Sequence, residues 1–191
     1  MSFTESIYGV LFEPAATLRD LAENKPYGRA LLIFLAVTLL SLIFEQALMV
    51  YNDSETLKIL PANAVWMFNI LGALLSVLLL LVISGLLSLI SEIIYGKFNA
   101  GGIMVALCYA SIPGILGPPV HYALSLAGVE WLGAILALLV MVWVLVLQVI
   151  AVRESLQVTT GQAILILVLP GLFSLILLTA LVVTVLLGVN I

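Results

Sequence analysis

Long apolar runs separated by short polar turns dominate the pattern of this chain. A helix needs about 20 apolar residues to cross the core of a bilayer, and five runs reach or exceed that length. The predicted spans cover residues 28–50, 66–95, 102–127, 131–152 and 162–188. This pattern predicts an all-α fold, a polytopic membrane helix bundle with five transmembrane helices, because helices satisfy their own backbone groups in lipid.

The segment before the first run, residues 1–27, is mixed in character and is predicted to lie outside the membrane core. Within it, EPAATLRDLAEN predicts a short helix from about Pro14 to Asn24, since proline suits the first helical position and Pro26 follows the end. The apolar residues of this helix share one face: Leu11, Ala15, Leu18, Leu21 and Ala22. We expect an amphipathic helix that lies in the membrane interface or docks as a cap on the protein's own helices.

The chain is therefore expected to comprise an N-terminal interfacial segment, residues 1–27, and a transmembrane domain, residues 28–191. The third span of that domain is the irregular one. The stretch from Gly101 to Gly128 holds three of the seven prolines, the only histidine and the only cysteine. Such irregularity inside a membrane marks either a binding site on a broken helix or a tightly packed central element.

Small residues recur every four positions at the start of this third span. They are Gly102, Ala106, Ala110 and Gly114, and they form a ridge along which a neighbouring helix could pack closely. Further on, Pro113 is expected to kink the helix, and Gly117-Pro118-Pro119 to break it. Because freed backbone groups need partners at membrane depth, we expect this span to be buried inside the bundle as its central packing element.

Three ionisable residues fall within the predicted spans. Glu45 lies near the end of the first span, Glu92 near the end of the second, and His121 in the irregular third. Charged groups inside a membrane are costly and often mark ion or proton pathways, and histidine titrates near neutral pH. The alternative is that the carboxylates lie at the membrane interfaces or face other helices, and that the histidine is interfacial or hydrogen-bonded.

Basic residues indicate how the chain is oriented in its membrane. Five of the six flank the same ends of the predicted spans: Arg19, Lys25, Arg29, Lys97 and Arg153. Only Lys58 lies at the other ends. Since basic residues favour the cytoplasmic side, we predict a cytoplasmic N-terminus and a C-terminus outside.

Composition excludes several function classes. The 191 residues are 64% hydrophobic and 8% charged, far from the balance of soluble domains, so the lipid bilayer is the expected partner. The net charge of −4, without a basic run, argues against nucleic acid. One histidine and one cysteine exclude most metal sites, and no catalytic motif is present. We therefore expect no enzyme activity, no catalytic, cofactor-binding or metal-binding residues, and no cofactor.

The chain resembles the Yip1 family of multi-pass membrane proteins, in particular a small bacterial-type member. The resemblance rests on LFEPAATLRDLAENKP before the first span, on Gly101 and Gly102 leading into LCYASIP, with Tyr109, Ala110 and Pro113, and on SLQVTTGQA before the last span. Eukaryotic members are associated with endoplasmic reticulum–Golgi vesicle traffic and with Rab GTPases, and carry a long cytosolic N-terminal region. With only residues 1–27 before its first span, this chain is expected in a prokaryotic plasma membrane.

Two functions remain open at this point. The first is a non-enzymatic integral membrane protein that organises membrane or partner proteins, or copies of itself, through helix packing. The second is a small-solute or ion transporter or channel, which would use the broken third helix and Glu45, Glu92 and His121 for coupling.

Overall fold

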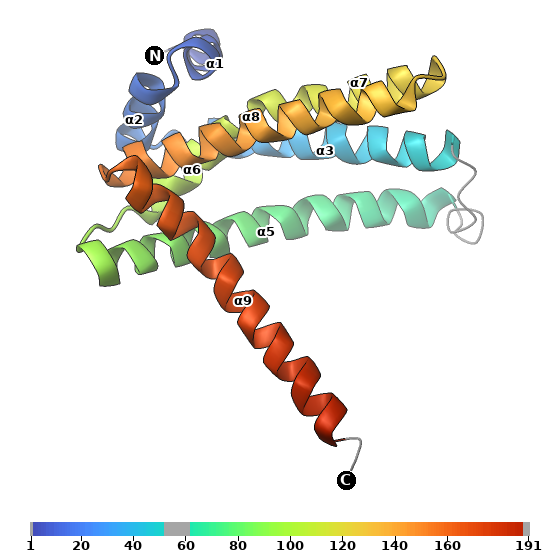
Figure 1. The fold of residues 1–191 in the computed structure, drawn as a ribbon. Helices are drawn as coiled ribbons and strands as arrows, with labels where there is room; N and C mark the ends of the chain where they lie inside the picture. The colour runs from blue at the N-terminus through green and yellow to red at the C-terminus, as the bar shows by residue number, and fades with distance from the viewer. Residues whose placement is uncertain (1, 52–61, 189–191) are drawn as a thin grey trace.

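The computed structural model describes residues 2–51 and 62–188, and nearly all of these are helical (Figure 1). Two short helices come first, α1 (Phe3–Phe12) and α2 (Pro14–Asn24). The long helices are α3 (Tyr27–Tyr51), α5 (Ala62–Tyr95), α8 (Glu130–Leu156) and α9 (Thr160–Gly188). Between α5 and α8 the chain forms α6 (Ala100–Ala110), the 3₁₀ helix η1 (Ile112–Leu116) and α7 (Gly117–Leu126).

Five segments of this described chain are long and apolar enough to cross a membrane, the third being α6, η1 and α7 together. The predicted all-α, five-span architecture is therefore confirmed, and the protein is an integral membrane protein in contact with lipid. The second span, Trp66–Tyr95, has the predicted bounds, although helix α5 itself begins at Ala62. The boundary that differs most is the end of α8, which continues to Leu156 rather than 152. The predicted loop with Lys58 lies outside the described residues, as do residues 189–191.

The polar residues after 152 continue α8 because other elements cover them. Ser155 and Leu156 are buried, and α8 packs against both α2 and α6 at this end. The side chains of Arg153 and Glu154 form an ion pair of 2.6 Å. Helix α8 ends only at Gln157, whose φ of 51° is left-handed.

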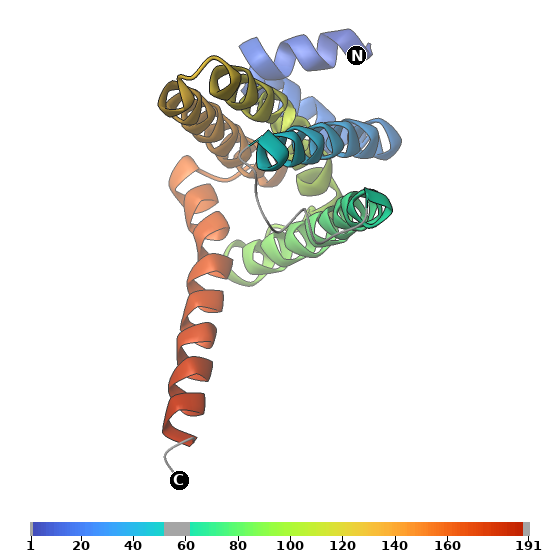
Figure 2. The ribbon, with the colours of Figure 1, turned by 90° about the vertical axis from the view of Figure 1, so that its right-hand side faces the viewer.

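The N-terminal segment is a pair of helices that cross the end of the bundle (Figures 1 and 2). Helix α2 has the predicted bounds, with Pro14 at its start. Its buried face, including Leu18, Leu21 and Ala22, packs on α6 and α8, so it docks on the protein's own helices. Helix α1 was not predicted.

Helix α1 folds back on α2 through a close contact. A Cβ atom at Gly9 would collide with the side chain of Thr17. Val10 of α1 is fully buried beside this contact, while Phe3, Tyr8 and Phe12 are exposed. The two helices therefore form a unit that is packed where they meet and that also exposes aromatic side chains, a composition typical of membrane interfaces.

The third span is the centre of the bundle. All residues from Gly102 to Ala110 are buried, and 61% of the most apolar window of this span is buried, against 22% or less in the other four. Helix α6 contacts α2, α3, α5 and α8. The prediction that this span is buried inside the bundle is therefore confirmed.

Helix α9 diverges from the rest. Viewed along the long helices, α3, α5, α7 and α8 gather together while α9 runs away from them (Figure 2). Its N-terminal end is capped by Thr159: the Thr159 Oγ1 accepts from the Gln162 backbone N–H, and the Thr159 N–H donates to the Gln162 side chain. Ala163 and Ile166 are fully buried against the bundle. Beyond Gly171, every side chain that the structure describes in α9 is exposed.

Candidate functional site: a pocket shared by Glu45 and His121

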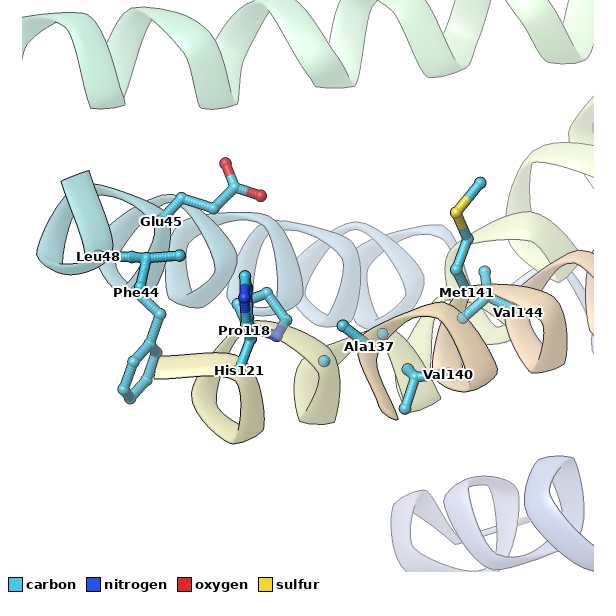
Figure 3. Close-up of a pocket in the computed structure, with 11 residues that line it drawn as sticks. Phe44, Glu45, Leu48, Pro118, His121, Ala137, Val140, Met141 and Val144 are labelled. Atoms are coloured by element: carbon cyan, nitrogen blue, oxygen red, sulfur yellow. The ribbon is translucent and has the colours of Figure 1, made fainter. Parts of the chain in front are cut away.

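Two of the three ionisable residues selected from the sequence line one pocket. The pocket has a volume of about 360 Å³ and lies between α3, α7 and α8 (Figure 3). Glu45 comes from α3 and His121 from α7, residues that are far apart in the sequence. The other lining side chains are mainly apolar: Phe44, Leu48, Pro118, Ala137, Val140, Met141 and Val144.

The breaks in the third span place His121 at this pocket. The chain leaves α6 as a tight 3₁₀ turn, η1, with Pro113 in its first turn. A new helix then starts at Gly117 with a proline in its first turn, where a missing N–H costs nothing. Helix α7 ends at Leu126, and the turn that follows it contains a left-handed Gly128, with a φ of 75°. The predicted kink and break are thus present, and they redirect α7 along α3 and α8.

Gly133 allows α7 to approach α8 closely. A Cβ atom on Gly133 would lie 2.9 Å from Cδ2 of His121 and 3.1 Å from its Cα. The first distance is shorter than real Cβ contacts and the second is tight, so a larger residue here would push the two helices apart. Within α7, the Ser125 hydroxyl donates a hydrogen bond to the His121 carbonyl oxygen at 2.9 Å.

Further contacts hold the pocket's α3 wall. The rings of Phe44 and Tyr122 pack at a centroid distance of 5.9 Å, which joins α3 to α7. The Asn69 amide of α5 donates to the side-chain oxygen of Gln46, the neighbour of Glu45. Both contacts fix the end of α3 that carries the carboxylate.

Glu45 and His121 differ in their surroundings. Glu45 is exposed and His121 is half-buried, and the structure assigns no ion pair between these two described residues. The pocket therefore combines an apolar lining with one carboxylate and one imidazole. That combination suits a mostly apolar molecule with a single polar group. Within residues 2–51 and 62–188, no group of three His, Cys, Asp or Glu residues comes together to hold a metal ion.

Glu92 is not part of this pocket. It lies near the C-terminal end of α5, at the opposite end of the bundle, and its side chain is exposed (Figure 1). An exposed carboxylate at a span end matches the interfacial interpretation better than the coupling one.

The candidate packing residues of the third span lie along α6 and η1. Five are buried and two, Gly101 and Gly114, are half-buried; the buried ones are Gly102, Ala106, Tyr109, Ala110 and Pro113. Added Cβ atoms at both Gly101 and Gly102 would collide with neighbouring side chains, those of Tyr27 and Asn99 respectively. Their role as a family signature stays a prediction.

A polar junction around Asn99 was missed from the sequence. Its side-chain oxygen accepts from the Gly102 N–H at 3.1 Å and so caps α6. Its amide donates to the Ser155 carbonyl oxygen of α8 at 3.0 Å, and its backbone N–H donates to the Ser88 hydroxyl of α5 at 2.9 Å. One residue thus joins three helices. An asparagine at the start of an apolar run is a known N-cap signal, but no pattern in the sequence indicates the two hydrogen bonds to other helices.

The Asn99 junction borders a second, polar pocket of about 430 Å³. Lys25 and Lys97 line it together with Glu23 and Glu154. The elements meeting here are the end of α2, the turn before α6 and the end of α8. The structure therefore brings two basic residues from distant segments, Lys25 and Lys97, together at one end of the bundle beside two acidic residues.

Comparison with known proteins gives one result. The family model described as the Yip1 domain matches residues 8–182, which reach from α1 into α9. No curated protein and no solved structure matches the chain. Because the family match includes residues of all five apolar spans, this protein belongs to the Yip1 domain family.

Proposed function

We propose that the protein is a non-enzymatic membrane protein that organises other membrane proteins, or copies of itself, through lateral helix packing. The observation that carries this proposal is the divergence of α9. Helix α9 packs on α8 and α5, with Ala163 and Ile166 fully buried, while further along it exposes Leu175, Ile176 and Val183. A helix that leaves its bundle inside a membrane offers a long apolar surface to neighbouring helices.

The interior of the bundle supports the same proposal. Helix α6, at its centre, buries only glycine and apolar or aromatic side chains and one cysteine from Gly102 to Ala110. Such packing excludes water, so the centre of the described bundle is unsuited to conducting polar solutes.

Photo-crosslinking within the membrane tests the organising function. A photoreactive residue at Ile176 of α9 is expected to give defined crosslinked products, either a dimer or a discrete partner. The matched control is the same group at Leu138 of α8, which is about equally exposed to the surroundings. Crosslinks to lipid alone at both positions would contradict the proposal, as would saturable solute flux through liposomes that contain the protein.

We further propose that the end bearing Lys25, Lys97 and Arg153 faces the cytoplasm of a prokaryotic cell, with the protein in the plasma membrane and its C-terminus outside. The support is the gathering of these residues at one end of the helices. Reporter fusions after Lys97 and after Gly128 are expected to give opposite topology signals. Equal signals would contradict the orientation.

A second candidate function is transport of a small solute or ion, and it is favoured by one observation. Glu45 and His121 line the same pocket beside the broken third span. If this pocket carries coupling groups, the pair Glu45→Gln and His121→Gln abolishes flux or growth that depends on the protein. Unchanged activity in both variants removes this candidate.

A further inference from the structure

A groove of about 470 Å³ lies beneath α1, nearer the N-terminal end of α3 than the Glu45 pocket. Phe3 and Ile7 of α1 form its roof, and Leu32 and Ala36 of α3 form its floor, with η1 closing one side. All lining side chains except one are apolar or aromatic. Its floor belongs to a membrane span, and its roof lies crosswise at the end of that span (Figures 1 and 2).

The exception is Arg29, which lies in the first turn of α3. Its guanidinium forms no ion pair within the described part of the chain. The nearest acidic residue along α1, Glu5, is engaged elsewhere: its carboxylate accepts from the Ser2 N–H at 2.7 Å. The first amides of α3 add the positive end of a helix dipole. The open end of the groove is therefore positively charged.

Depth in the membrane separates the two parts of this groove. Ala36 lies seven residues after Arg29 on α3, which is roughly 10 Å along a helix axis at 1.5 Å per residue. Arg29 is thus placed near the membrane surface, and the apolar floor reaches into the hydrocarbon region. This is the arrangement of a phospholipid, with a phosphate at the surface and an acyl chain below it.

We propose that this groove binds one anionic glycerophospholipid, with its phosphate on Arg29 and an acyl chain under α1 along Leu32 and Ala36. Arginine matches phosphate oxygens with two parallel N–H donors. The absence of an acid from the groove lining favours an anionic headgroup over a zwitterionic one. The site differs from the Glu45–His121 pocket in its location and charge, and goes beyond the proposed organising function.

Native mass spectrometry of the delipidated full-length protein tests this proposal. Phosphatidylglycerol is expected to bind more tightly than phosphatidylcholine with the same acyl chains. Arg29→Gln is expected to weaken phosphatidylglycerol binding about fivefold or more, which is the scale of one basic residue at an anionic surface, and to remove the preference between the two lipids. Arg29→Lys retains a partial preference, because the charge remains.

Three controls separate this site from general attraction. Lys97→Gln removes a cation at the same end but outside the groove, and should leave binding unchanged. Ala36→Phe fills the groove but leaves Arg29 in place, and it should weaken the binding of both lipids. Inorganic phosphate at millimolar concentration should not displace the lipid, because it lacks the acyl chain. The proposal is overturned if Arg29→Gln keeps the preference, if Lys97→Gln weakens binding equally, if Ala36→Phe has no effect, or if phosphate displaces the lipid.

Discussion

Single residues set the helix spacing around the candidate site. Gly133 leaves room for the backbone and ring of His121, and Gly102 leaves room for the Asn99 side chain that caps α6. Not every glycine in the spans has such a neighbour: a Cβ atom at Gly85 would meet nothing within 4 Å. The contribution of a glycine here therefore depends on what lies opposite, which predicts different outcomes for the same substitution.

Gly133→Ala is expected to destabilise the protein by about 1–3 kcal/mol, because the new methyl group overlaps the His121 backbone and helices must move apart. Gly85→Ala is the matched control, and it should be neutral or stabilising by up to about 1 kcal/mol since alanine favours helix. Unfolding in detergent measures both. Equal stability of the two variants would contradict the close contact.

Substitution of Asn99 is expected to lower the stability of the protein for two reasons that can be tested separately. Asn99→Ala removes the cap of α6 and the hydrogen bond to α8, and should lower the free energy of unfolding by about 1–2 kcal/mol or more. The lost cap alone accounts for the lower end of that range. Asn99→Asp keeps an oxygen for the Gly102 N–H but loses the amide that donates to Ser155. Its loss of stability should be intermediate. If both variants unfold like the wild type, the junction does not stabilise the bundle.

At the scale of elements, the N-terminal unit shows how short helices persist when they have a surface to pack on. Helices of about ten residues are marginal in water, yet α1 and α2 bury Val10, Leu18 and Leu21 against each other and the bundle. Helix α1 also has a capping box, in which the Ser2 hydroxyl accepts from the Glu5 N–H and the Glu5 carboxylate accepts from the Ser2 N–H. The S-x-x-E spacing is visible in the sequence and could have predicted this helix.

The capping box makes the stability of α1 depend on pH. Hydrogen bonds from the Ser2 backbone and side chain lower the pKa of Glu5 below its usual 4.5. A lowered carboxylate pKa means that the stabilisation is complete above about pH 4.5 and is lost as the pH falls through the lower folded-state value. Hydrogen exchange of α1 amides, compared with those of α2, should show more fraying at pH 3 than at pH 6. Glu5→Gln should remove most of this difference in α1.

At the scale of the whole molecule, α6 is the centre and α9 the most independent part. Water does not drive helices together within lipid, so close packing and hydrogen bonds have to hold the bundle. Ala163 and Ile166 of α9 are fully buried against the bundle, and the helix then diverges from it. Its attachment therefore depends on few residues.

Two isoleucines in α9 test this attachment. Ile166→Ala removes buried contacts and is expected to lower the free energy of unfolding by about 1–3 kcal/mol. This lies at or below the usual cost of a cavity in a protein core, because lipid competes for the same surface. Ile176→Ala, at a position that is 66% exposed, should change stability by less than about 0.5 kcal/mol. Detergent-induced unfolding measures both. A similar cost at the two positions would show that α9 packs along its whole length.

Much of this architecture follows from the sequence alone, because helix length, apolar content and proline position act locally. The five spans, the break between Pro113 and Pro119, the start of α2 at Pro14 and the Thr159 cap are all local effects. The continuation of α8 to Leu156 was missed, since its polar last turn is stabilised by contacts with other helices rather than by its own residues.

What only the tertiary structure decided is which residues meet. Glu45 and His121 were each selected as isolated polar residues, and nothing in their spacing showed that they share a pocket while Glu92 lies at the other end. The same holds for Asn99 and Ser155, and for Arg29 above the groove under α1. Periodicity determines that a segment is a helix and which face is apolar. The partner of that face depends on how five helices of similar composition pack, and side-chain shape and small residues such as Gly133 decide that packing.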